Sequence, residues 1–259
     1  MTFDVVAAAR RRMRRLMLVA AGGALAVCAL VYPAGLYVNA RMADRAQPAP
    51  ATTDPTPPGP SPSLLPSPVA VVLPADTAWS TVAGVAVPYS ATAGPLLHER
   101  GLASGFARSP AGALLAAVHL LVNTTPQVGA AIFVPTLRQQ VVGPHAAAMQ
   151  AAVASDYERI GGDPTVGGPV GLLPAALAGA RLAAFTDRAA NTDPAARIDL
   201  LTVAIDATGT ARFAATLIDL VWTGADWALL APPGGRWDGL VTAVAPSAAA
   251  TYPPLGPGR

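Results

Sequence analysis

The chain has 259 residues, of which 53% are hydrophobic, and its seventeen basic residues are all arginine. The net charge of +2 is unevenly distributed: seven arginines face three acidic residues before Ala75, whereas ten arginines face twelve acidic residues from Ala75 onward, a net charge of −2. Nucleic-acid binding needs a clustered positive surface, and the one cysteine, Cys28, permits neither a disulfide framework nor a cysteine metal site. The composition therefore argues against direct nucleic-acid binding and against a disulfide scaffold.

The N-terminal segment predicts a membrane anchor. Residues 1–15, which we expect in the cytoplasm, contain five arginines close to their end: Arg10, Arg11, Arg12, Arg14 and Arg15. Residues 16–38 carry no charge, and as a helix with ~1.5 Å rise per residue they would extend about 35 Å, enough to cross a hydrocarbon core of ~30 Å. Only Arg41 and Arg45 follow, so the excess of positive charge predicts a cytoplasmic N-terminus and an extracytoplasmic C-terminal part. We expect a single-pass protein of the cell membrane, in contact with the lipid bilayer.

Two other interpretations of the anchor are weaker. Val38-Asn39-Ala40 resembles a signal-peptide cleavage site, but the apolar run is longer than the roughly 7–15 residues of a cleaved signal. Leu25-Ala26-Val27-Cys28 resembles a lipobox, but Val27 is large for the position before the cysteine and the following residues stay apolar. An uncleaved signal-anchor is favoured, and cleavage stays open.

A proline-rich linker covers residues 39–74. Nine prolines fall within residues 46–68, a composition that favours polyproline II and would extend about 70 Å. The linker would act as a semi-rigid stalk, although a plain disordered spacer would have the same composition.

Three helices are predicted in the first half of an extracytoplasmic domain at residues 75–245. The first begins at Pro110 with Ser109 as its cap and carries apolar residues at helical spacing. The second begins near Pro126 and is interrupted at Pro135, and the third runs from Pro144 to a glycine pair at Gly161. Before them, residues 69–90 read as irregular with at most a short strand.

The second half of this domain predicts four strands with short turns between the last three. The segments are residues 180–186, 197–206, 210–222 and 226–231. Helices followed by an antiparallel meander indicate an α+β layout. The Ala- and Pro-rich residues 246–259 are expected to be a disordered tail.

This order of elements resembles the nuclear-transport-factor-2-like fold, in which a curved four-stranded antiparallel sheet wraps around helices. With the anchor and stalk, the chain is similar to the VirB-eight and TcpC groups of conjugation and type IV secretion assembly proteins. Several stretches also resemble an uncharacterised actinobacterial membrane-anchored family of integrative conjugative elements: GVAVPYS, AGP, GFARSPAGALLAAV, QVVGP and VWTGADWALLAP. The resemblance covers about residues 75–245 and implies a scaffold, since none of these stretches encodes chemistry.

A search for chemistry finds no strong signal. The histidines, His98, His119 and His145, are isolated, and no HExxH, CxxC, GxSxG or P-loop pattern occurs. Three strand aspartates, Asp199, Asp206 and Asp219, would matter if one pointed into a closed pocket. We expect no catalytic, metal-binding or cofactor-binding residue and no enzymatic activity.

The predicted function is a scaffold that contributes protein–protein contacts to a conjugative DNA-transfer apparatus, with other secretion components as partners. Trp222, Trp227 and Trp237 are candidates for an interaction surface or for self-association, although burial in the hairpin's own core is the competing use. Two alternatives stay open: a small-molecule-binding or SnoaL-like enzymatic domain, and a cell-envelope interaction protein unrelated to conjugation.

Overall fold

The computed structural model describes residues 71–99, 101–186 and 194–257. Two β-hairpins come first, β1 (Ala78–Val82) with β2 (Val85–Tyr89), and β3 (Leu97–Glu99) with β4 (Leu102–Ser104). The helices and remaining strands follow in this order: α2 (Pro110–Asn123), η1 (Pro126–Val128), α3 (Ala130–Gln139), β5 (Val141–Val142), α4 (Ala146–Arg159), β6 (Ala176–Thr186), β7 (Ala195–Ile205), β8 (Ala211–Trp222), β9 (Trp227–Leu230), η2 (Pro233–Gly235), β10 (Val241–Val244) and α5 (Pro246–Ala249).

Six of these strands form one mixed sheet in the order β5-β9-β8-β7-β6, with β10 paired to β8 beside the part that β9 leaves free. The three long strands β6, β7 and β8 are antiparallel, and β5 pairs with β9 in parallel. Strand β5 lies between α3 and α4 in the sequence. The chain therefore adds one short strand to the edge of the sheet between two helices.

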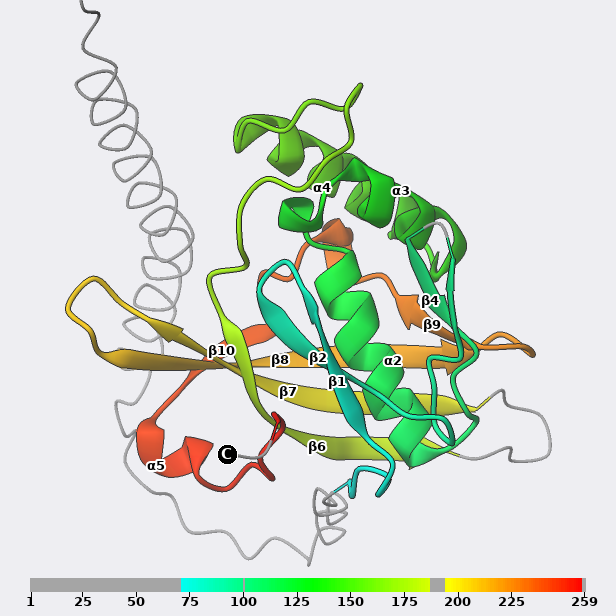
Figure 1. The fold of residues 1–259 in the computed structure, drawn as a ribbon, viewed down its shortest axis with the longest axis vertical. Coiled ribbons are helices and arrows are strands. Elements are labelled where there is room, and N and C mark those ends of the chain that lie inside the picture. The colour runs from blue at the N-terminus through cyan, green and yellow to red at the C-terminus, as the bar shows by residue number, and fades with distance from the viewer. Residues whose placement is uncertain (1–70, 100, 187–193, 258–259) are drawn as a thin grey trace, which may run out of the picture. The chain divides into compact units, whose positions relative to one another are not determined.

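Helix α2 is the centre of the domain. It begins where expected, because the Ser109 side chain accepts the Gly112 N–H at 3.1 Å and Pro110 occupies the first turn. One side of the helix contacts β7 and β9 of the sheet, and another contacts β2 and β4 of the hairpins (Figure 1). Because it is enclosed on both sides, its leucines Leu114, Leu115 and Leu120 are at most 1% exposed.

The predicted nuclear-transport-factor-2-like domain is wrong. The prediction was three helices followed by a four-stranded antiparallel sheet. The structure instead has a six-stranded mixed sheet, and two hairpins precede its first helix. Strand β5 has two residues and β10 has four, too few for a period of two to stand out from the surrounding sequence. The β1–β2 hairpin was interpreted as irregular because Gly84 and Pro88 interrupt its apolar pattern.

The two later helices differ in detail from the prediction. Helix α3 continues through Pro135, which was expected to break it. The helical spacing of Met149, Val153, Tyr157 and Ile160 predicts one buried side for α4; the first three are buried, but Ile160 lies after the end of the helix and is 40% exposed.

The C-terminal residues are ordered where disorder was expected. After α5, the Ala180 N–H donates to the carbonyl of Pro253 at 3.0 Å and the Leu255 N–H donates to the carbonyl of Ala178 at 3.2 Å, so the chain runs along the edge of β6. Tyr252 and Leu255 are buried, and their two side chains hold this Ala- and Pro-rich stretch against the rest of the domain. We refer to residues 246–257 as the C-terminal strap.

The predicted anchor, its arginines and the proline-rich residues 46–68 lie outside the described residues. Within the part of the chain that the structure describes, no helix is long and apolar enough to cross a membrane.

Candidate functional site

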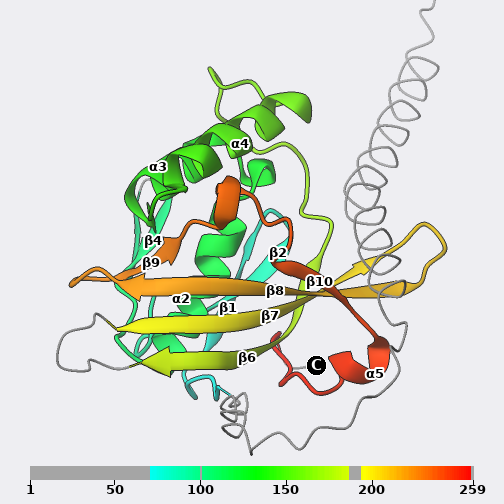
Figure 2. The ribbon, with the colours of Figure 1, turned by 180° about the vertical axis from the view of Figure 1, so that it is seen from behind.

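The long strands present two different faces. Toward α2 they carry residues of the main core, among them Ile198, Leu200, Ile218 and Leu220. Because successive side chains alternate between the faces of a sheet, Arg197, Asp199, Leu201, Leu217 and Asp219 lie on the opposite face. Figure 2 views the strands from behind, with α2 on their far side.

A groove of about 420 Å³ lies on this second face, between the sheet and the C-terminal strap. Its apolar lining includes Leu217, Leu240 and Val244, together with several alanines. Its polar lining includes Arg181 and Asp199 from the sheet and Tyr252 from the strap. The groove therefore combines apolar walls with a small polar cluster contributed by two distant parts of the sequence.

The polar cluster is closely connected. Arg181 Nε lies 2.9 Å and Nη2 2.8 Å from Oδ2 of Asp199, and the Tyr252 hydroxyl donates to the same oxygen at 2.7 Å. Arg181 Nη2 also donates to the Tyr252 hydroxyl at 2.9 Å, and the guanidinium carbon lies 4.1 Å from the centre of the Tyr252 ring. Burial, followed by the hydrogen bond to the Asp199 carboxylate, raises the pKa of Tyr252 to about 12, so the phenol stays neutral.

Gly179 on β6 allows the strap to come this close. A Cβ atom at this position would lie 2.8 Å from Cβ of Tyr252 and 2.9 Å from the carbonyl oxygen of Pro253. Any larger residue would push the strap away from the strand, so this glycine is part of the construction of the groove.

A second ion pair lies beside the first. Arg197 donates to both oxygens of Asp219, from Nε at 2.6 Å and from a terminal nitrogen at 2.9 Å, and this raises the pKa of the guanidinium. The pair joins β7 to β8 at the register position where the two residues are cross-strand neighbours. Its side chains are 51% and 30% exposed, so the pair contributes little to stability.

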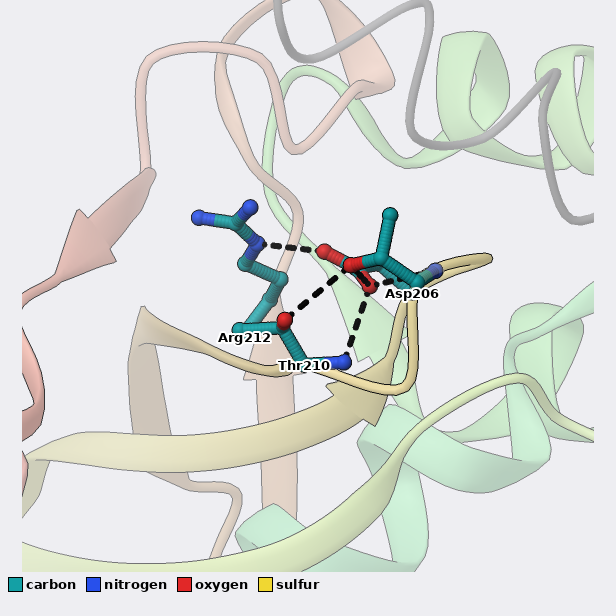
Figure 3. A network of polar contacts seen from close by, with 4 residues as sticks. Asp206, Thr210 and Arg212 are labelled. Atoms are coloured by element: carbon teal, nitrogen blue, oxygen red, sulfur yellow. Dashed lines mark hydrogen bonds and ion pairs between the residues drawn. The ribbon is translucent and has the colours of Figure 1, made fainter.

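The three strand aspartates do not meet in one pocket, since only Asp199 lines the groove. Asp199 and Asp219 lie on the face away from α2, each paired with an arginine. Asp206 directly follows β7 and organises the tight turn into β8, accepting hydrogen bonds from Thr208, Thr210 and Arg212 (Figure 3). The hydrogen bond from Thr208, followed by that from Arg212, lowers the pKa of Asp206 well below its usual range.

The tryptophans predicted as an interaction surface do not share one exposed surface. Trp227 is 1% exposed, its Nε1 donates to the carbonyl of Ala107 at 2.9 Å, and its ring meets that of Trp222 edge-on with centroids 5.4 Å apart. Trp222 and Trp237 are half-buried and pack against the main core. The structure thus uses these rings for packing.

The structure brings two of the three histidines together, since the ring centroids of His98 and His119 are 5.9 Å apart. His119 is buried in α2, His98 lies on the exposed strand β3, and His145 precedes α4. Among residues 71–99, 101–186 and 194–257, no group of three or more His, Cys, Asp or Glu side chains is placed to hold a metal ion.

Sequence reasoning missed the roles of Tyr252, which lines the groove, and of Asp226, which lies outside it. Tyr252 was assigned to a disordered tail, although an aromatic residue followed by Leu255 in a Pro-rich stretch is a signal for packing. Asp226 was predicted to begin the last strand, but it lies in the turn before β9, and its carboxylate accepts the N–H groups of Gly105 at 2.6 Å and Phe106 at 3.1 Å. Burial raises the pKa of Asp226, and these hydrogen bonds oppose that rise. They also join the β8–β9 turn to the segment between β4 and α2.

Most of this chain matches a known sequence family. A sequence model described as a domain of unknown function, DUF8175, matches residues 40–251, which include Arg181 and Asp199 and end one residue before Tyr252. No curated protein and no solved structure matches the chain.

Proposed function

We propose that this chain, which belongs to the family of the domain of unknown function DUF8175, is a membrane-anchored scaffold that binds other proteins and has no enzymatic activity. The observation that carries the proposal is the second face of the sheet. It bears a groove with apolar walls, while the face toward α2 is filled by the core. A recess with apolar walls and a few fixed polar groups is a common form of binding site.

The predicted anchor and stalk would present this face outside the membrane. The arginines of residues 1–15 favour a cytoplasmic N-terminus, and the proline-rich linker would hold the domain away from the lipid. In this proposal the groove is the contact surface and the anchor determines where that contact is made.

The proposed setting is a conjugative DNA-transfer apparatus of the type IV secretion kind. Its support is the resemblance of residues 105–118 and 221–232 to a family of integrative conjugative elements, together with the predicted anchor. The fold no longer supports it, because the nuclear-transport-factor-2-like likeness is wrong.

A SnoaL-like enzymatic function is less well supported. It would need an acid between the sheet and the helices, and that face carries Ile198, Leu200, Ile218 and Leu220. The acids of β7 and β8 lie on the other face and are paired with arginines.

The test places a photo-crosslinking residue at Thr242, an exposed position of β10 that lines the groove, in the full chain in its native membranes. Leu172, 73% exposed and not among the groove residues, serves as the matched control position. We expect a defined crosslink to a transfer-system protein from Thr242 and none from Leu172, and loss of DNA transfer when the gene is deleted. Unchanged transfer after deletion contradicts the conjugative setting, and identical crosslinks from both positions contradict the groove.

A further inference from the structure

Asp199 has an unused acceptor in the groove. The three polar contacts that it makes with Arg181 and Tyr252 all end on Oδ2, and Oδ1 accepts no hydrogen bond from any residue that the structure describes. Oδ1 is also accessible to solvent. Among the described residues, the buried side-chain polar atom that lacks a hydrogen-bond partner is Oε1 of Gln140, and Oδ1 of Asp199 is not such an atom. Asp199 therefore offers one fixed carboxylate oxygen to a ligand.

Arg181 has an unused donor beside it. Nε and Nη2 are engaged with Asp199 and Tyr252, whereas Nη1 donates to none of the described residues. The side chain is 30% exposed, and its position over the Tyr252 ring holds the guanidinium in place. Since Arg181 and Asp199 are directly opposite each other on β6 and β7, the spare donor and the spare acceptor come from neighbouring positions.

This pair of groups matches the main chain of an extended peptide. In a β-strand the N–H and the C=O of one residue point to the same side, as they do when they pair with a neighbouring strand. Oδ1 of Asp199 can accept the N–H, and Nη1 of Arg181 can donate to the C=O. The ion pair has no net charge, so it does not favour a charged ligand over this neutral one.

The walls of the groove define the side chains that would fit. Leu217, Leu240 and Val244 are apolar and the alanines leave space between them. The volume of about 420 Å³ lies within the ~300–1,000 Å³ of ligand pockets and leaves room for aliphatic side chains.

We propose that the groove binds a short extended segment of a partner protein, uncharged and with aliphatic side chains, through main-chain hydrogen bonds to Asp199 and Arg181. This inference rests on the proposed protein-binding function and names its site and the class of its ligand. Tyr252 is a positioning residue in this site, because it holds Oδ2 of Asp199 and leaves Oδ1 for the ligand.

The experiment uses the full chain in lipid nanodiscs and a library of random seven-residue peptides displayed on phage as the probe. Thr242→Trp fills the groove from an exposed position of β10, and Ala184→Trp, at an exposed position of β6 outside the groove, is the matched control. Enriched peptides are then synthesised with both ends blocked, and each residue is N-methylated in turn to remove its N–H.

We expect aliphatic peptides that bind the wild type and Ala184→Trp equally and bind Thr242→Trp at least about tenfold more weakly, which corresponds to about 1.4 kcal/mol. N-methylation at one residue should weaken binding by a similar factor in the wild type but not in Asp199→Ala, which has no side-chain acceptor. Equal binding to both tryptophan variants, or no enrichment over empty nanodiscs, would overturn the inference. If the Thr242 crosslink in native membranes persists in that case, the protein-binding function stands and only the peptide assignment fails.

Discussion

His119 makes the stability of the domain sensitive to mild acid. The residue is 2% exposed in the middle of α2, and burial, followed by the nearby His98, lowers its pKa to about 4. Its Nε2 lies 2.8 Å from the carbonyl oxygen of Pro88, and since a carbonyl can only accept, this nitrogen carries the proton of the neutral ring. The folded domain therefore holds the neutral imidazole, whereas the unfolded chain protonates it at a pKa near 6.5.

The sign and size of the effect follow from these two pKa values. A lowered pKa in the folded state contributes stability that is fully present above the unfolded value of 6.5 and is lost as the pH falls toward 4. Linkage gives a loss of about 2 kcal/mol between about pH 7.5 and about pH 5.0. With a urea m-value of ~2 kcal/mol per M, the midpoint of unfolding should fall by about 1 M.

The measurement is urea unfolding of residues 64–259 at both pH values, followed by tryptophan fluorescence. His119→Gln keeps an N–H that can reach Pro88 but cannot be protonated, so its midpoint should fall by clearly less than that of the wild type. Carboxylate groups titrate in both proteins and cancel in the comparison. Equal falls in the two proteins would show that His119 is not the titrating group and would refute the reasoning.

Three further substitutions test the hydrogen bonds that build the domain. Tyr252→Phe removes the hydroxyl that joins the strap to Asp199 and should lower the free energy of unfolding by about 1–2 kcal/mol, seen as a Tm lower by about 4 °C. Because the pKa of Tyr252 is raised to about 12 from 10.0, the wild type should also lose stability as the pH rises from 10 through 12, and a variant with the same alkaline loss would contradict this account. Asp226→Ala leaves the N–H groups of Gly105 and Phe106 without their acceptor and should cost about 2–3 kcal/mol in chemical unfolding; a cost below about 0.5 kcal/mol would show that water replaces the carboxylate. Ser109→Ala should cost about 1 kcal/mol through loss of the α2 cap, compared with at most about 0.5 kcal/mol for Ser80→Ala on the exposed side of β1.

The elements with strong local signals were predictable. Ser109 and Pro110 identify the start of α2, and Gly209 and Gly224 identify turns beside β8, where both have positive φ. The three long strands β6, β7 and β8 and the short strand β9 also lie close to their predicted positions. Capping and turn formation depend on residues a few positions apart, so the chain carries this information locally.

The candidate site was not predictable in the same way. Arg181, Asp199 and Tyr252 are separated by up to seventy-one positions and share no motif. Only the pairing of β6 with β7 and the course of the strap over β6 bring them together. The strap itself was missed because two buried side chains do not change the average composition of an Ala- and Pro-rich stretch.

By itself, the sequence determined the start of α2, the alternation of the long strands, the excess of arginine before an uncharged segment and the absence of common catalytic motifs. Each of these depends on neighbouring residues or on composition. The tertiary structure decided the six-stranded mixed sheet, the burial of Trp227 and the groove on the second face. Each of these requires contacts between residues far apart in the chain, whose free energy comes from burial and hydrogen bonding that no local pattern records.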